Sequence, residues 1–419
     1  MKYIFLSLLF FSINSIAQQP CDANKQPIVF VHGFLASGDS WSTQVQRFKN
    51  NGYCENQLFV FDWNTIGSEK TDSLLEVFIK MVLTKTKSTQ INLVAHSAGG
   101  GLCFSFLKDS LRSKLVSHYV HIGSITIPGL AGTHNEIPTM NIFSPDDKVV
   151  KGVFIDGVIN IKEDGMDHLQ VATSVASFEA MYSFFNDEKM PATKEMMLHK
   201  TGKSKISGRA VTLGENTPLS KDSIFLYEFD AQKGERISKK PIVLITDSNG
   251  YWPSTFVNSN SYLEFELRPK NGRVIHYFIE PQATDNNLIY LRSIATTGIA
   301  GKMLHAIPKN DTTVALAIFS TDHAIVYGRD SLTIDGINLS TPELTTAKKT
   351  IVASFLFDDG DGITSAKAIK SFGIGVFLNA VDVFIKADST QHSSIYYNGK
   401  RILLPRIASK DGVMVAIFN

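Results

Sequence analysis

The stretch that decides the fold is Ile91–Gly101, which reads INLVAHSAGGG. Its first five residues, Ile91–Ala95, have the composition of a short buried strand, and the small residues after Ser97 open a helix. A serine between a strand and a helix, with small residues two positions before and two after it, is typical of a nucleophile elbow. Ser97 is therefore the candidate nucleophile, and the alternative is a serine that only caps the helix.

Strand and helix patterns alternate on both sides of this stretch, from Pro27 to Asn186. Strands are expected at Ile28–Val31, Leu58–Phe61, Ile91–Ala95, His118–Ile122, Met140–Phe143 and Val158–Ile161. Helices are expected at Leu74–Thr84, Gly101–Leu115 and Val171–Phe185. Near-continuous apolar strands separated by helices indicate a parallel sheet that helices cover on both faces. We therefore expect one compact α/β domain.

From Ser204 onward, strand-like runs follow one another with turn residues between them and few helical patterns. The clearest runs are Ile224–Tyr227, Ile242–Ile245, Leu263–Leu267, Ile275–Ile279, Val314–Phe319, Ile351–Phe357 and Val413–Phe418. This half is expected to be all-β and sandwich-like, in two modules. The expected division gives residues 18–190 to the α/β domain, 191–203 to a linker, 204–297 to the first β module and 298–419 to the second.

The first residues have the three parts of a secretory signal peptide. Lys2 supplies a positive charge, Tyr3–Phe11 is almost wholly apolar, and Ser15 and Ala17 are the small residues of a cleavage site. We expect residues 1–17 to be removed and the protein to be secreted or periplasmic. No later stretch has the length and apolarity of a membrane span, so no transmembrane segment is expected after cleavage.

The composition excludes several classes of protein. With 43% hydrophobic and 19% charged residues, the chain is not expected to be disordered. Its 41 basic and 40 acidic residues argue against nucleic acid as a partner. Three cysteines are too few for a disulfide-built scaffold, although Cys21 and Cys54 can form one bridge and Cys103 fits a buried thiol. No His/Cys spacing indicates a metal site, and no cofactor is expected.

The strand Ile28–Val31 runs into His32-Gly33-Phe34, upstream of the elbow. Acyl transfer needs two backbone N–H groups aimed at the oxyanion that develops in the transition state. One is expected from Ala98, the residue after the nucleophile, and the other from Phe34 in the loop after this early strand. Phe34 and Ala98 are the candidate oxyanion-hole residues.

The remaining members of a catalytic triad are expected in the order acid, then histidine. The strand Met140–Phe143 leads into two carboxylates, of which Asp147 is the preferred acid and Asp146 the alternative. His168 follows the last expected strand of the α/β domain and is the only histidine between the acid and residue 190. It is the candidate general base, and the alternative is a surface histidine.

Several segments resemble the small α/β-hydrolase lipases. These are Val29–Phe34, Leu93–Gly100 and Asp167–Ser174, together with Thr246–Trp252 and His276–Pro281 in the β half. The chain is similar to microbial secreted lipases and carboxylesterases, in which an α/β-hydrolase domain precedes a β-rich region implicated in binding long acyl chains. The resemblance implies hydrolysis of fatty-acyl esters by Ser97, Asp147 and His168, with lipid or another ester as substrate and possible contact with a lipid interface.

Two other functions are kept as alternatives. The first is hydrolysis of a polyester or another acyl ester by the same triad. The second is a non-catalytic protein whose β modules bind lipid or polymer. An intact set of triad residues argues against the second alternative.

Overall fold

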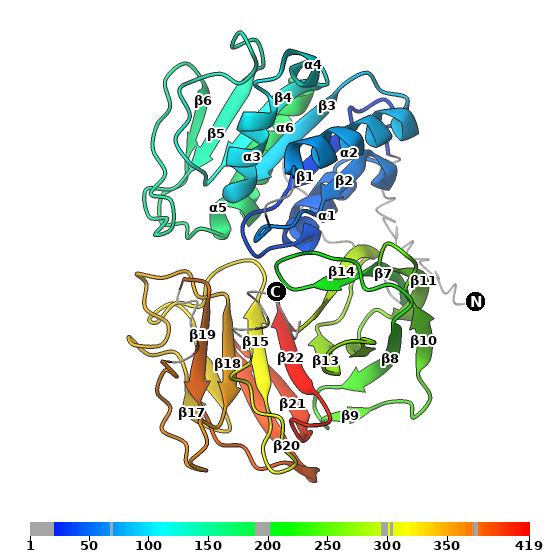
Figure 1. The fold of residues 1–419 in the computed structure, drawn as a ribbon, viewed down its shortest axis with the longest axis vertical. Coiled ribbons are helices and arrows are strands. Elements are labelled where there is room, and N and C mark those ends of the chain that lie inside the picture. Colours follow the sequence, from blue (N-terminus) through cyan, green and yellow to red (C-terminus); the bar gives the residue numbers. More distant parts are fainter. Residues whose placement is uncertain are drawn as a thin grey trace, which may run out of the picture.

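The computed structural model describes residues 21–67, 70–188, 202–294, 301, 305–370, 372 and 376–419. It has an α/β half and a β half, which lie one above the other in Figure 1. The expected signal peptide and the expected boundary between the β modules, near residues 295–300, lie outside the described residues, as does most of the expected linker. In the described part of the chain, no helix has the length and apolarity needed to cross a bilayer.

The α/β half contains a six-stranded sheet of order β2-β1-β3-β4-β5-β6, in which every pairing is parallel. Its strands are β1 (Ile28–Val31), β2 (Leu58–Phe61), β3 (Ile91–His96), β4 (Val116–Ile122), β5 (Thr139–Phe143) and β6 (Ile159–Lys162). The helical elements are η1 (Gly38–Trp41), α1 (Ser42–Asn50), η2 (Glu55–Gln57), α2 (Thr71–Thr86), α3 (Ala98–Phe106), α4 (Ser110–Ser113), α5 (Gln170–Thr173) and α6 (Val175–Asn186). The expected α/β-hydrolase fold class is confirmed.

Helices cover both faces of this sheet because successive strand residues point to opposite sides. In β1, Ile28 and Phe30 pack into one core with residues of α1 and α6. Val29 and Val31 pack into a second core with residues of α2 and α3. Both faces are apolar, which is why the strands read as continuous hydrophobic runs.

Three helical regions differ from the prediction. The helix expected over Val171–Phe185 is divided at Ser174 into α5 and α6, because the Ser174 hydroxyl caps α6. Helix α1 (Ser42–Asn50) was not expected, because its sequence is mostly polar and only Val45 and Phe48 anchor it in the core. The helix expected over Gly101–Leu115 is interrupted after Phe106, and a new turn of helix, α4, begins at Ser110. Asp109 causes the restart, since its carboxylate accepts hydrogen bonds from the first amides of α4.

The β half is built from three sheets. A nine-stranded sheet of order β10-β8-β12-β13-β22-β15-β18-β19, with β9 paired to β8, lies between a three-stranded sheet, β11-β7-β14, and a four-stranded sheet, β17-β16-β20-β21. The strands are β7 (Lys203–Thr212), β8 (Ser223–Asp230), β9 (Glu235–Arg236), β10 (Ile242–Ile245), β11 (Tyr251–Asn258), β12 (Tyr262–Arg268), β13 (Ile275–Ile279), β14 (Asn286–Ser293), β15 (Leu316–Ser320), β16 (Leu332–Ile334), β17 (Ile337–Asn338), β18 (Ala353–Phe357), β19 (Leu378–Asp382), β20 (Asp388–Tyr397), β21 (Lys400–Arg406) and β22 (Val413–Phe418).

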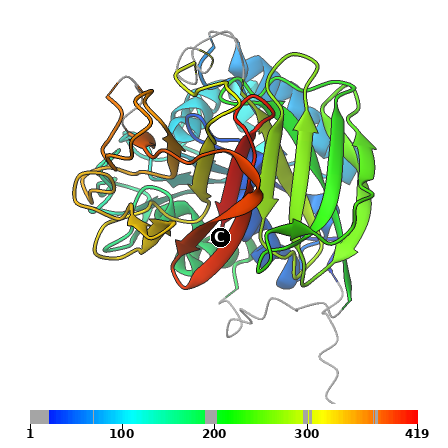
Figure 2. The same cartoon turned by 90° about the horizontal axis from the view of Figure 1, so that it is seen from below.

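The two expected β modules, 204–297 and 298–419, share one sheet instead of forming two sandwiches. The last strand, β22, pairs in parallel with β13 from the first segment and with β15 from the second. It appears as the red strand between green and yellow strands in Figure 2. Alternate residues of β22 enter the two cores of the β half, Val413 and Val415 one core and Met414 and Ala416 the other. Pairing over such a sequence distance leaves no local signal in the sequence.

The cysteines are placed as the sequence allows. Cys21 and Cys54 form a disulfide with a Cα–Cα distance of 4.9 Å. Cys103 is a free and fully buried thiol in α3. The bridge ties the start of the described chain to the loop before β2, at the edge of the six-stranded sheet.

Candidate active site

Ser97 lies at the turn between β3 and α3, in a backbone conformation with φ 54° and ψ −125°. A positive φ is costly for a residue with a side chain, so neighbouring groups must hold this turn. The Ser97 amide donates to the carbonyl of Ile122 at 3.0 Å, and the Ser124 hydroxyl donates to the Ser97 carbonyl at 2.6 Å. Both contacts come from β4 and the loop after it, next to β3 in the sheet.

Three glycines leave room for the turn. A Cβ on Gly33 would lie 2.9 Å from the Ser97 Cβ, and one on Gly99 would lie 2.6 Å from the His32 carbonyl oxygen. A Cβ on Gly100 would lie 2.4 Å from the Ser124 hydroxyl oxygen. These distances are too short for real contacts, so the small residues around Ser97 are required by backbone packing, as the elbow pattern predicts.

The side chains of Ser97, His168 and Asp147 form one chain of hydrogen bonds. The Ser97 Oγ is 2.9 Å from Nε2 of His168, and Nδ1 of His168 is 2.7 Å from Oδ2 of Asp147. Asp147 and His168 are buried, with exposed fractions of 0% and 2%. The structure thus brings together three residues that lie up to 71 positions apart in the sequence. A carboxylate on Nδ1 leaves Nε2 free to accept the serine proton.

The two candidate acids lie in different environments. The Asp147 Oδ1 accepts hydrogen bonds from the amides of Val149 at 2.8 Å and Val150 at 3.2 Å, which leaves Oδ2 for His168. Burial raises the pKa of Asp147, but the His168 hydrogen bond and these two amides outweigh it, and the net pKa is lowered. The side chain of Asp146 is 54% exposed, and its carboxylate accepts a hydrogen bond from the Gly165 amide. Of the two acids, only Asp147 contacts His168.

The two candidate oxyanion donors flank Ser97. Ala98 is the first residue of α3, so its amide has no partner within the helix. Phe34 follows Gly33, which lies against Ser97, and its amide pairs with no backbone acceptor in the described residues. Both groups are therefore free to donate to an oxygen on the carbon that Ser97 attacks.

His96 lies against His168, with the ring centroids 4.6 Å apart. Its Nε2 is 2.8 Å from the His168 carbonyl oxygen, so a neutral His96 donates to the backbone of the residue it supports. Burial lowers the pKa of His96 to about 3. His96 therefore stays neutral and fixes the loop that carries His168.

A cavity of about 160 Å³ opens beside Ser97 and His168, and its lining is mostly apolar. One wall comes from the loop after β1, including Phe34. The other wall comes from the β half and consists of Leu213, Arg292, Phe319, Ser320, Thr321, Val352, Phe377 and Leu378. A second cavity, of about 40 Å³, shares Leu213, Arg292 and Phe319 with the first and lies deeper against the nine-stranded sheet. The sequence carries no signal for this wall, because its residues become neighbours of Ser97 only after the two halves pack together.

Two clusters of potential metal ligands occur in the described residues, and both lie outside this site. They consist of Glu264, Glu266 and His276, and of Asp358, Asp359 and Asp382. The first cluster is already occupied by ion pairs, since Arg236 contacts both glutamates and Arg268 contacts Glu266. Neither cluster includes Ser97, His168 or Asp147.

The low pKa of His96 predicts a loss of stability in acid. Between about pH 6.5 and pH 3 the unfolded chain binds a proton at His96 that the folded chain does not, so stability falls as the pH falls. His96→Gln keeps an N–H donor and cannot titrate. Between pH 7 and pH 5 this variant should lose about 2 kcal/mol less unfolding free energy than the wild type, as measured by urea denaturation. The control is His134→Gln at an exposed position. An unchanged pH dependence in His96→Gln would contradict the assignment.

Comparison with known protein families gives two matches, in the order of the chain. Residues 25–108, which contain β1, the loop with Phe34 and the Ser97 elbow, match the family described as "Lipase (class 2)". Residues 202–296, in the first part of the β half, match the "Lipase C-terminal domain".

The solved structures to which parts of this chain are similar include several hydrolases. A predicted CIB-like hydrolase from Thermoplasma acidophilum is 15% identical over 39% of this chain and 86% of its own, with a TM-score of 0.29. Naproxen esterase from Bacillus subtilis is 12% identical over 40% and 86%, with a TM-score of 0.31. A lipase from Bacillus licheniformis in its mature form is 23% identical over 26% and 44%, with a TM-score of 0.22. These values are too low to bear on function, which rests on the family matches.

Both matched families are lipase families, and their order agrees with the two halves of the fold. The two matched segments therefore support a lipase/esterase with a C-terminal domain, and with it the activity of a carboxylic ester hydrolase.

Proposed function

We propose that this ester hydrolase works through an acyl-enzyme in which Ser97 is the nucleophile, His168 the general base and Asp147 the residue that orients His168. The observation that carries the proposal is the unbroken hydrogen-bonded chain, with 2.9 Å from Ser97 to His168 and 2.7 Å from His168 to Asp147. The exposed Asp146 is the less suitable acid, because its carboxylate does not contact His168.

The reaction follows from these roles. His168 accepts the Ser97 proton at Nε2 while the Ser97 oxygen attacks the ester carbonyl carbon. The amides of Phe34 and Ala98 donate to the oxyanion, and a donor of this kind typically contributes about 3–4 kcal/mol. His168 then protonates the leaving alcohol, and a water activated by the same imidazole releases the acid from the acyl-enzyme.

The proposed substrates are esters of fatty acids. The cavity beside Ser97 has a mostly apolar lining, and apolar walls favour a hydrocarbon chain over a polar acyl group. We assign part of this binding to the β half, because residues such as Val352 and Phe319 form its second wall. Hydrolysis of a polyester or another acyl ester remains the second candidate, since the same cavity accepts an apolar polymer segment. The hydrogen bonds that join Ser97, His168 and Asp147 argue against a purely binding role.

Contact with a lipid interface is part of the proposal. Phe34, Ile125 and Val376 have exposed fractions of 39%, 58% and 45% and lie in or next to segments that line the cavity or contact Ser97. Exposed apolar side chains around a site mark a surface that binds an apolar phase. The rates on emulsified and on dissolved esters test this part, and a lack of preference for the emulsion contradicts it.

The triad is tested by comparing the two neighbouring acids. Asp147→Asn should lower kcat by about 10³–10⁴-fold on a short-chain ester, because the amide holds His168 in the wrong tautomer. Asp146→Asn is the matched control and should retain kcat within about threefold, since its side chain is exposed. Ser97→Ala should reduce the rate to near background. Equal losses in the two aspartate variants would overturn the choice of Asp147.

The acyl-binding role is tested at Val352, which lines the cavity from the β half. Val352→Trp should fill this space and lower kcat/KM for long-chain esters by about tenfold or more, while acetyl esters lose little, because a filled pocket excludes the longer chain. Val243→Trp at an exposed position of β10 is the control. If Val352→Trp lowers the rates on acetyl and long-chain esters equally, the cavity does not bind the acyl chain.

Secretion is also proposed, with residues 1–17 as the cleaved signal peptide. The Cys21–Cys54 disulfide supports this, because such bridges persist in oxidising compartments. Amino-terminal sequencing of the exported protein should give Gln18 as the first residue. A protein that stays inside the cell, or is exported with residues 1–17 attached, would contradict the proposal.

A further inference from the structure

The loop that carries the Phe34 amide has a strained backbone. Leu35 has φ 59°, in the left-handed region that non-glycine residues seldom adopt. Such a conformation is unfavourable for a residue with a side chain and persists only where surrounding contacts hold it. The neighbours of Gly33–Gly38 therefore decide whether the Phe34 amide stays in place.

Some of these contacts come from the β half, through the turn Leu213–Thr217 after β7. The Thr65 hydroxyl accepts a hydrogen bond from the Leu35 amide at 3.0 Å and donates to the Gly214 carbonyl at 3.0 Å. The Thr65 amide donates to the same carbonyl at 3.2 Å. The strained residue is thus linked to the β half through a single intervening side chain.

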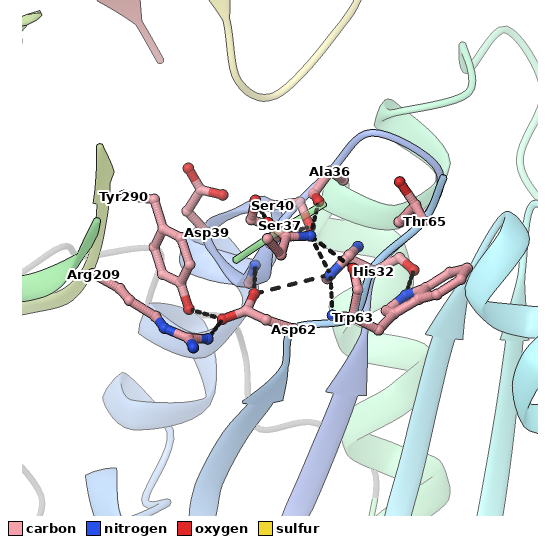
Figure 3. A network of polar contacts seen from close by, with 12 residues as sticks. His32, Ala36, Ser37, Asp39, Ser40, Asp62, Trp63, Thr65, Arg209 and Tyr290 are labelled. Atoms are coloured by element: carbon pink, nitrogen blue, oxygen red, sulfur yellow. Dashed lines mark hydrogen bonds and ion pairs between the residues drawn. The ribbon is translucent and has the colours of Figure 1, made fainter. Parts of the chain in front are cut away.

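Asn216 in the same turn contacts the loop directly. Its Oδ1 accepts a hydrogen bond from the Ser37 hydroxyl at 2.5 Å, and its Nδ2 donates to the Ala36 carbonyl at 2.9 Å and the Trp63 carbonyl at 2.8 Å. Figure 3 shows the positions of Ala36, Ser37 and Trp63 in this network. Asn216 is 6% exposed, so breaking these bonds would leave buried polar groups without partners.

His32 connects this network to the Phe34 peptide. Its Nδ1 is 2.9 Å from the Gly33 carbonyl oxygen, and its Nε2 lies 3.3 Å from the Trp63 amide nitrogen. Burial lowers the pKa of His32, so the neutral ring donates to Gly33 and accepts from Trp63. Because the peptide is planar and trans, holding the Gly33 carbonyl toward His32 turns the Phe34 N–H to the opposite side.

The far end of the loop is held separately. The Asp62 carboxylate accepts the Gly38 amide at 2.7 Å, and it also contacts Arg209 at 2.5 Å and the Tyr290 hydroxyl at 2.7 Å, both from the β half. Figure 3 shows Arg209 and Tyr290 on one side of Asp62 and His32 on the other. Asp62 thus contacts Gly38 and, at 3.9 Å, His32, whereas Asn216 contacts Ala36 and Ser37, the positions between Leu35 and Gly38.

We propose that Asn216 is a positioning residue for the oxyanion hole, so that the β half completes the catalytic machinery for every acyl chain length. The inference rests on the proposed function, in which the Phe34 amide stabilises the oxyanion. It predicts that loss of Asn216 weakens stabilisation of the transition state and changes substrate binding little. The reason is that a misplaced amide affects the oxyanion and not the ester in the ground state.

The test uses Asn216→Gly in the full-length mature protein. Asn216 has φ 55°, which glycine adopts without strain, so the substitution removes the side chain and its hydrogen bonds without straining the backbone. On a short-chain ester we expect kcat to fall about 10–100-fold while KM stays within about threefold. The affinity for an alkyl boronic acid, which forms a tetrahedral adduct with the serine, should fall in parallel. Asn398→Gly, at an exposed position with φ 46° between β20 and β21, is the matched control and should leave all these values unchanged.

A second variant gives a pH signature that a purely structural role would not. In Asn216→Asp the carboxylate cannot donate to the Ala36 and Trp63 carbonyls, whereas the protonated carboxyl group can donate one hydrogen bond. The ratio of its kcat to that of the wild type should therefore rise as the pH falls. The corresponding ratio for Asn216→Gly should not depend on pH.

The outcomes separate this inference from the proposed function. If the wild type hydrolyses esters and folded Asn216→Gly retains kcat and boronic-acid affinity within twofold, the inference is wrong and the proposed function stands. If Asn216→Gly does not fold, Ser37→Ala removes the hydrogen bond that Asn216 accepts, and an unchanged kcat in that variant is equally contradictory. A wild type without esterase activity would overturn the proposed function, and this inference with it.

Discussion

The rest of the active site depends on the left-handed turn at Ser97. This turn raises the serine hydroxyl above the carboxyl edge of the sheet, where the loops after β1, β5 and β6 converge. It is held by the hydrogen bonds to Ile122 and from Ser124, and it fits only because Gly33 and Gly99 have no side chains. A hydroxyl in this position lies 2.9 Å from Nε2 of His168, and the proposed oxyanion donors, Phe34 and Ala98, lie in the segments next to it.

The β half contributes more than a second wall for the cavity. It contacts the loop that carries Phe34 through Asn216, and it also contacts the loop that carries His168. The Asp167 carboxylate, one residue before the proposed base, accepts from the Ala324 amide at 2.9 Å and forms an ion pair with Arg329 at 3.2 Å. Two loops of the α/β half, each next to Ser97, are thus held by residues of the β half.

Local sequence patterns predicted the α/β half well, because buried parallel strands are continuous apolar runs and the elbow requires small residues around Ser97. They did not predict α1, whose mostly polar sequence depends on tertiary packing, or β20, which carries few apolar residues. The three triad candidates could be found because their order along the chain is fixed by the topology. Asn216 and Val352 could not, since their relation to Ser97 exists only after the halves pack, and no periodicity encodes that contact.

The measurement that tests the central claim most directly is covalent labelling by an alkyl fluorophosphonate, followed by mass spectrometry of the intact protein and of its peptides. Such a reagent reacts only with a serine that a neighbouring base activates. The account predicts one phosphonyl group per chain, located on Ser97, and a strongly reduced rate of labelling in His168→Ala. Labelling at a different serine, or an esterase that hydrolyses its substrate while Ser97 stays unmodified, would contradict it.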